Sequence, residues 1–446
     1  MNRNAAQADA EAKLRQEGDV NLSPLRQAWE ASAHDAATRQ LLAEDSRYYI
    51  HQALSTPCLD VVTACEGIYL YDGRGRAIID FHGNSAHQVG YRHPRVLAAV
   101  VEQLQSLPFA PRRFTNEPAI ELARRLASLA PGRLNKILLA PGGTSAIGIA
   151  LKMARYATGR YKTISMWGTF HGASLDAISV GGEDFFRDGL GPLLPGAFHV
   201  PWPRDENDLA LMEEIFVREG DIGAVLAEPM RCTTIDRPTN AYWQGVRELC
   251  DRHGALLIFD EIPLALGRTG RMFCCEHVGV TPDLLVLGKG LGGAVFPLAA
   301  VIARDDLDCA ADRALGHYTH EKTPVGAAAA LAVLDVIRDE NLLLHAEEIG
   351  HYATSKLRQL QHECSAIGEI RSLGLAIGVV LSGPPEVARR RAERILYGCL
   401  SRGLSFKISD GNVLTLFPPL VITYSQMDQA LQMVADTVRE VLSTEN

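Results

Sequence analysis

Three charged residues stand directly after short apolar runs, and their types decide which chemistry this sequence offers. Glu228 follows "AVLA", Asp260 follows "LLIF" and Lys289 lies in "LLVLGKG". A partly desolvated lysine has a lowered pKa, and its amine becomes nucleophilic. A buried carboxylate needs a cationic partner, and a protonated pyridine nitrogen is one. The alternatives are a solvated lysine in a glycine turn and an ordinary ion pair between Asp260 and an arginine such as Arg268.

A second group of residues is suited to an anion and a flat ring. The segment "LLAPGGTSAIGIALKMAR" is typical of a strand, a turn and a helix. Helix N-termini bind phosphate through free N–H groups, so Gly143, Thr144 and Ser145 are candidate donors. In "WGTFHGAS", the aromatic side chains of Phe170 and His171 could stack on a planar ring. An ordinary capped loop and two core aromatics are the alternatives. An amine, a carboxylate, a phosphate cradle and a stacking ring together specify pyridoxal phosphate.

These residues need a scaffold that holds strand ends side by side. From about residue 90 to 330, short β-rich runs alternate with segments of helical period, which indicates a mostly parallel sheet covered on both faces. Ligands of such sheets bind outside the carboxyl ends of the strands. The sequence therefore predicts an α/β fold with a large cofactor-binding domain at 76–330. A smaller C-terminal α+β domain is predicted at 331–446.

The rest of the chain is predicted to support this core. Residues 1–75 are expected to form an N-terminal helical arm and the start of a hairpin, whose full extent is 66–82 around an Asp-Gly turn. After Thr323 the pattern "PVGAAAALAVLDVIRDENLLLHAEEIGHYATSKLRQLQ" predicts one long helix.

Composition narrows the class of protein. The chain has 446 residues, 47% of them hydrophobic, and a formal charge of −9. It has no long basic run, so we expect neither nucleic-acid nor membrane-surface binding. The polar N-terminus lacks an apolar signal core, and a cytoplasmic location is expected. The 9 cysteines and 14 histidines show no metal-ligand spacing, which predicts reduced thiols and no metal site.

Two adjoining segments carry a family resemblance. "DEIPLALGRTGRMF" followed by "TPDLLVLGKGLGGAVFPLAAV" resembles the signature of the class III (ω-) aminotransferase family of fold-type I pyridoxal phosphate enzymes, and the resemblance covers about residues 60–440. It implies that Lys289 forms the Schiff base, that Asp260 pairs with the pyridine nitrogen, and that Thr319 reaches the phosphate of a partner subunit in a homodimer. The cofactor-binding residues expected are Gly143, Thr144, Phe170, His171, Glu228, Asp260, Ile262, Lys289 and Thr319.

The sequence departs from the family pattern at four places. Pro263 replaces a glutamine that bonds the phenolic oxygen of the cofactor, and Ser145 replaces a glutamate in the phosphate segment. Thr415 stands in "NVLTLFPPL" where many members have an arginine for the substrate carboxylate. A hydroxyl cannot replace that charged fork. "HYTHEKTP" replaces a glycine-rich segment. The missing arginine at position 415 argues against simple α-amino acid or 2-oxoglutarate recognition.

The substrate is expected to carry a different anion. Arg112 and Arg113 lie in "LPFAPRRFTNEP", and paired arginines suit a dianion such as a phosphonate, although two surface arginines are the alternative. Four segments, "FHGNSAHQVGYRHP", "APRRFTN", "DEIP" and "HYTHEKTP", together resemble the ammonia-releasing lyases of the family that act on small phosphonylated amines. The expected reaction removes a proton with Lys289 and eliminates water to give an enamine, whose hydrolysis then releases ammonia and an aldehyde. The substrate-binding residues expected are Arg112, Arg113 and Thr415. The rivals are an ω-aminotransferase, which needs an oxo acid, and a non-catalytic cofactor-binding protein.

Overall fold

The structure is a computed structural model that describes residues 23–53 and 55–445. Its contacts divide the chain into two compact units. The first comprises Met1–Asn84, Thr233–Ile235 and Leu344–Asn446, and the second comprises Ser85–Cys232 and Asp236–Leu343. The three-part division predicted from the sequence stays a prediction.

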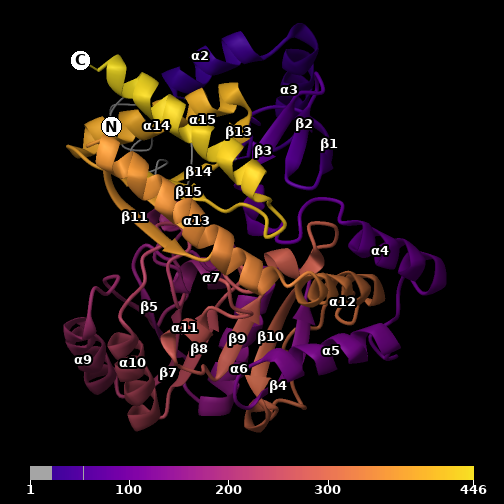
Figure 1. Cartoon of the computed structure of the whole chain (residues 1–446). Coiled ribbons are helices and arrows are strands. Elements are labelled where there is room, and N and C mark those ends of the chain that lie inside the picture. The colour runs from indigo at the N-terminus through magenta and orange to yellow at the C-terminus, as the bar shows by residue number, and fades with distance from the viewer. Residues whose placement is uncertain (1–22, 54, 446) are drawn as a thin grey trace. The chain divides into compact units, whose positions relative to one another are not determined.

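The second unit is built on a sheet of seven strands in the order β4-β10-β9-β8-β7-β5-β6 (Figure 1). Only β10 runs antiparallel to its neighbours, so the sheet is mostly parallel, as predicted. All residues of β7, β8 and β9 are buried, which requires cover on both faces. The strands are β4 (Leu134–Ala140), β5 (Lys162–Met166), β6 (Ala197–Val200), β7 (Ile222–Ala227), β8 (Leu256–Asp260), β9 (Leu284–Leu287) and β10 (Ala299–Arg304).

Helices of the second unit cover this sheet. Helix α6 (Gly143–Thr158) packs across its centre with eight buried residues, and α10 (Asn240–His253) packs against β7 and β8. Helix α12 (Pro324–Asp339) packs on α4 (Pro94–Ser106) and α5 (Glu117–Leu129). The shorter helices are α7 (Leu175–Val180), α8 (Asp184–Arg187), α9 (Leu209–Glu219), α11 (Cys275–Val278), η2 (Glu206–Asp208), η3 (Lys289–Gly292) and η4 (Asp305–Leu307).

The first unit contains two four-stranded sheets. One has the order β1-β2-β3-β13, and its β2–β3 hairpin turns at Asp72 and Gly73, as predicted. The other has the order β11-β12-β15-β14. The strands are β1 (Val62–Glu66), β2 (Tyr69–Asp72), β3 (Ala77–Asp80), β11 (Ile367–Leu373), β12 (Ala376–Leu381), β13 (Leu404–Ser405), β14 (Lys407–Ser409) and β15 (Val413–Leu416). The helices are α2 (Pro24–Ala33), α3 (Ala36–Tyr48), α14 (Pro385–Arg402) and α15 (Tyr424–Ser443). The 3-10 turn η1 (Gly83–Ser85) follows β3, and its last residue belongs to the second unit.

Two predictions about helices have different outcomes. Helix α2 lies within the predicted helical arm. Ser23 accepts a hydrogen bond from the Arg26 N–H, and Pro24 stands in the first turn. Residues 1–22 of the predicted arm lie outside the described residues. The prediction of a single long helix after Thr323 is wrong. Asn341 adopts a left-handed φ of 51°, which ends α12 and starts α13 (Leu342–Glu363), because asparagine tolerates this conformation at little cost. No helix among residues 23–53 and 55–445 is long and apolar enough to span a membrane.

Candidate functional site

The three charged strand ends lie at one edge of the large sheet. Strands β7, β8 and β9 are neighbours and parallel, so their carboxyl ends coincide. Glu228 follows β7, Asp260 ends β8 and Lys289 begins η3, two residues after β9. Burial raises the pKa of Glu228, the nearby Asp260 carboxylate raises it further, and His171 opposes the rise. The edge therefore brings two buried acids and one lysine together, and the raised pKa of Glu228 favours its uncharged form.

Asp260 is held in place by a histidine. His171 Nδ1 lies 2.8 Å from Asp260 Oδ2, and the side chains are 0% and 3% exposed. The other carboxylate oxygen accepts a hydrogen bond from the Ile262 N–H at 3.0 Å. The sequence suggested that His171 stacks on a ring, whereas its contact here is a hydrogen bond to Asp260. This pairing was not predicted, since 89 residues separate the partners.

The start of α6 lies against the residues that follow β8 and β9. The N-cap residue of α6, Gly142, provides no side-chain hydrogen bond, so its first N–H groups have no side-chain cap. A β-carbon at Gly143 would come within 2.7 Å of Ile262 Cδ1, and one at Gly288 within 3.2 Å of Ile262 Cγ2. Ile262 therefore contacts both the predicted phosphate segment and the lysine segment.

A second contact fastens α6 to the loop that carries Phe170 and His171. Thr144 Oγ1 lies 2.8 Å from Ser174 Oγ and accepts the Ser174 N–H at 3.3 Å. Gly172 has a φ of 122°, and a β-carbon there would collide with Thr144. The lack of a side chain at Gly172 allows this close approach. Neither Ser174 nor Gly172 was singled out from the sequence, although the small residues of "HGAS" are the signal that points to them.

Phe170 lies in the same loop and is half-buried. Its ring packs on Phe186 with the centroids 4.4 Å apart. A ring held from one side in this way is suited to present its other face to a planar ligand.

The backbone of the lysine turn is unusual. Lys289 has a φ of 45° without being glycine, and its side chain is half-buried. Left-handed backbone in a non-glycine residue is strained and persists only where the surroundings hold it. Such strain is commonly found at functional sites.

Glu261 follows Asp260 but points to a different set of partners. Its carboxylate accepts the N–H groups of Cys274 and Cys275 at 2.5 and 2.7 Å, and it is fully buried. Burial raises the pKa of Glu261 to about 7, against those two hydrogen bonds. Glu261 thus fastens the 261–275 segment, and Pro263 is buried within it. These two residues support the loop after β8.

The two loops predicted to lie near the substrate contact each other. Arg112 Nη1 donates to the His317 carbonyl oxygen at 2.7 Å. Asn116 Nδ2 donates to the Lys322 carbonyl oxygen at 2.9 Å. The arginine loop and the "HYTHEKTP" segment therefore form one surface in the second unit.

Two other predicted residues of the second unit are exposed, and a third belongs to the first unit. Arg113 and Thr319 are exposed, each in a turn of these two loops. Thr415 belongs to the first unit, in β15, and its hydroxyl donates to the Thr233 carbonyl oxygen at 2.6 Å. Its oxygen also lies 2.9 Å from Ser409 Oγ. The Thr415 hydroxyl therefore has no proton left to donate to a ligand.

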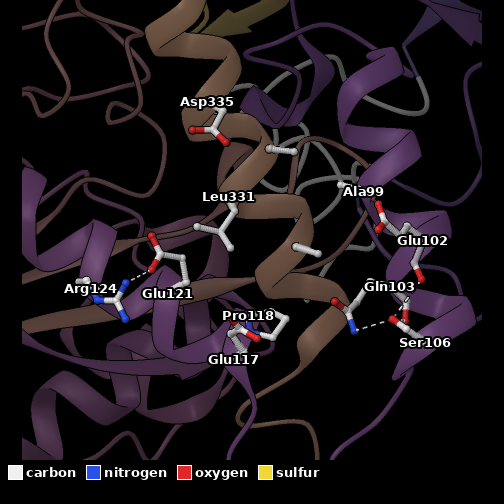
Figure 2. A pocket seen from close by; sticks show the side chains of 12 residues that line it. Ala99, Glu102, Gln103, Ser106, Glu117, Pro118, Glu121, Arg124, Leu331 and Asp335 are labelled. Carbon is white, nitrogen blue, oxygen red and sulfur yellow. Dashed lines mark hydrogen bonds and ion pairs between the residues drawn. The ribbon is translucent and has the colours of Figure 1, made fainter.

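A surface cavity of the second unit offers different chemistry (Figure 2). It has a volume of about 520 Å³ and lies among α4, α5 and α12. Its charged lining is mainly acidic, with Glu102, Glu117, Glu121 and Asp335 against Arg124, which pairs with Glu121. Such a lining repels a dianion. We therefore place no phosphonate there.

The edge of the large sheet fits pyridoxal phosphate. The first turn of α6 can hold a phosphate, the buried Asp260 can pair with a protonated ring nitrogen, and Lys289 offers an amine. Ile262, which lies against Gly143 and Gly288, and the half-buried Phe170 add apolar side chains to these segments. No cluster of three or more potential metal ligands occurs in the described part of the chain.

Comparisons with known proteins identify the family of this chain. Residues 50–438 match the aminotransferase class-III family. The (R)-1-hydroxy-2-aminoethylphosphonate ammonia-lyase of Vibrio splendidus is 45% identical, with 96% of each chain covered. An acetylornithine aminotransferase of Methanopyrus kandleri is 36% identical over 84% of this chain and 93% of its own. A transaminase crystal structure from a marine Virgibacillus superposes with a TM-score of 0.86 at 26% identity, covering 92% of this chain and all of that one. The chain therefore belongs to the aminotransferase class-III family and is a pyridoxal phosphate-dependent enzyme.

Proposed function

We propose that this protein is an ammonia-lyase that converts (R)-1-hydroxy-2-aminoethylphosphonate to phosphonoacetaldehyde and ammonia. The observation that carries the proposal is the 45% identity to the Vibrio lyase, which extends over 96% of both chains. The residues that the cofactor requires are present at the sheet edge, whereas Thr415 stands where many members have an arginine for a substrate carboxylate.

The chain's own residues hold the cofactor in this proposal. The N–H groups of Gly143 and Thr144 bind the phosphate, and Asp260, held by His171, keeps the ring nitrogen protonated. The bound cofactor supplies an electron sink for the substrate carbon that bears nitrogen. Glu228 lies beside Asp260, and burial raises its pKa, which favours the uncharged form of Glu228 next to that carboxylate.

Lys289 moves the proton. Its amine removes a proton from the carbon that bears nitrogen, and the electron pair released expels the hydroxyl of the adjacent carbon. The Lys289 ammonium returns its proton to this hydroxyl, which leaves as water. The resulting enamine takes up water and breaks into the aldehyde and ammonia, so one water leaves and one returns. No oxo acid is consumed.

The dianion is assigned to the arginine loop. Arg112 is held by the His317 carbonyl, which fixes the direction of its guanidinium, and Arg113 is exposed beside it. Two guanidinium groups can bind the three oxygens of a phosphonate through paired hydrogen bonds. Thr415 remains a weaker candidate, because its oxygen can only accept a hydrogen bond.

We further propose a homodimer in which Thr319 completes the phosphate site of the partner subunit. Leu97, Val101 and Leu104 of α4 are 36%, 45% and 51% exposed. Their spacing puts them in one stripe, and an exposed apolar stripe of this kind favours association. The exposed position of Thr319 is compatible with a role across the interface.

A cytoplasmic location is part of the same proposal. All nine cysteines are free thiols, and five of them are buried. Unpaired thiols are typical of a reducing compartment. Cys309 is the exposed one.

An ω-aminotransferase acting on a small amine is the second candidate, and the family match and the acetylornithine aminotransferase relative favour it. The two activities differ in one requirement, because a transaminase needs an oxo acid to regenerate its cofactor.

The deciding experiment measures ammonia released from the hydroxyphosphonate by the purified enzyme with no oxo acid present. Sustained release over many turnovers supports the lyase, and Lys289→Ala should abolish it while the protein still binds the cofactor. Turnover that appears only after pyruvate is added would establish the aminotransferase instead. No turnover in either mixture would contradict both proposed activities.

A further inference from the structure

One buried amide in the second unit has no hydrogen-bond partner. Gln88 lies in the loop before α4 and is 1% exposed. Neither Gln88 Oε1 nor Gln88 Nε2 has a hydrogen-bond partner among the described residues. A buried donor or acceptor left unpaired destabilises the folded state. The unpaired amide of Gln88 therefore lowers the stability of the folded state, and such a group calls for an explanation.

The carboxamide lies on the turn that carries the lysine. A β-carbon built on Gly290 would collide with the oxygen, the carbon and the nitrogen of the Gln88 amide. Gly290 directly follows Lys289 in η3. The absence of a side chain at Gly290 is thus what lets the amide reach the backbone of this turn.

The turn is held from two sides. Ile262 contacts Gly288, where a β-carbon would lie 3.2 Å from Ile262 Cγ2, and Gln88 covers Gly290. Lys289 stands between these two glycines with its left-handed φ of 45°. Strained backbone persists where its surroundings over-determine it, and Gln88 is part of those surroundings.

Packing alone does not account for a glutamine here. An apolar side chain of similar volume, such as methionine, would fill the same space without burying unpaired polar atoms. Stability given up at one position is the usual sign of a residue retained for activity. A carboxamide also has both donors and an acceptor, which lets it bond to backbone groups of either kind.

We propose that Gln88 is a positioning residue for Lys289. Its carboxamide braces the lysine turn through Gly290, so that the Lys289 amine occupies the same place each time it takes up a proton. The hydrogen bonds of the amide form with the turn when substrate is bound, because catalytic contacts tighten in the loaded site. This inference rests on the proposed role of Lys289 in proton transfer.

The test is Gln88→Met, which keeps the volume and removes the polar atoms. We expect the turnover number to fall about 10²-fold, the effect of a small misplacement of a catalytic group, with KM little changed. The melting temperature should stay the same or rise, since an unpaired buried amide is lost. Gln105→Met, on the exposed face of α4, is the matched control and should leave both quantities unchanged.

A second measurement does not depend on turnover. In the cofactor-free protein, the rate at which acetic anhydride modifies Lys289, read by mass spectrometry against the other lysines, should rise in Gln88→Met because the amine is less confined. Gly290→Ala should give the same faster labelling and a similar loss of turnover, since its methyl group displaces the carboxamide. It serves as the second variant if Gln88→Met does not fold.

Three results would overturn the inference. They are an unchanged turnover number in Gln88→Met, unchanged labelling of Lys289, or a melting temperature that falls in step with activity as a purely structural residue requires. Failure of the underlying function is distinguishable, because it would appear in the wild type as an absence of acceptor-free ammonia release or as activity that survives Lys289→Ala.

Discussion

The bond between His171 and Asp260 gives the sharpest single prediction. His171→Phe keeps the ring and removes the donor 2.8 Å from Asp260 Oδ2, which leaves the Ile262 N–H on the other oxygen. A hydrogen bond to a charged group contributes about 1.5 to 3 kcal/mol, and 1.4 kcal/mol is a factor of about ten. We therefore expect pyridoxal phosphate to bind about 10- to 100-fold more weakly.

The assay is titration of the cofactor-free protein with pyridoxal phosphate, followed by absorbance. His171→Asn should recover part of the affinity, because its amide nitrogen can stand where Nδ1 stands. His253→Phe is the matched control, since His253 stacks on Phe216 with the centroids 4.7 Å apart and has no carboxylate partner. Wild-type cofactor affinity and turnover in His171→Phe would refute the reasoning that Asp260 depends on this histidine.

Three further predictions concern the substrate loop, a buried acid and a glycine. Arg113→Gln should raise KM for the phosphonate about tenfold or more and leave cofactor affinity unchanged, because it removes one charge-assisted contact; equal steady-state kinetics would contradict the phosphonate pocket. Burial raises the pKa of Glu261 to about 7 from its ordinary 4.5, so the folded protein keeps this proton at a higher pH than the unfolded chain. The stabilisation of the folded state by this proton is complete below pH 4.5 and is lost as the pH rises to 7, a change of about 3 kcal/mol in the free energy of unfolding. Glu261→Gln should flatten this pH dependence of the melting temperature between pH 5 and 8. Parallel curves for the two proteins would show that Glu261 does not titrate there. Gly172→Ala should destabilise the protein by about 1 to 3 kcal/mol, because its φ of 122° disfavours a side chain and its methyl group meets Thr144; an unchanged melting temperature would contradict this.

Local patterns predicted much of the scaffold. Alternating apolar runs predicted the parallel sheet, and the positions of Glu228, Asp260 and Lys289 after three of those runs predicted that they lie at one edge. This succeeds because strand period and strand ends are local properties, and the topology of parallel sheets then brings the ends together.

Contacts between segments that are distant in the chain could not be predicted from the sequence. The bond between His171 and Asp260, the contact of Arg112 with the His317 carbonyl and the cover of Gly290 by Gln88 each join residues far apart in the chain. The break at Asn341 was missed for a different reason: apolar residues on both sides continue the helical period, and one left-handed residue changes direction without changing the pattern.

The distribution of buried and exposed cysteines gives the protein a natural site for labelling with a thiol-reactive dye. Cys309 is the exposed cysteine, while Cys250, Cys274, Cys275, Cys364 and Cys399 are buried. Thiol reagents react first where the sulfur is accessible, so a maleimide dye should attach preferentially at Cys309. That position precedes the segment whose His317 carbonyl binds Arg112. Fluorescence from a dye there would follow the movement of this loop during substrate binding without any engineered cysteine.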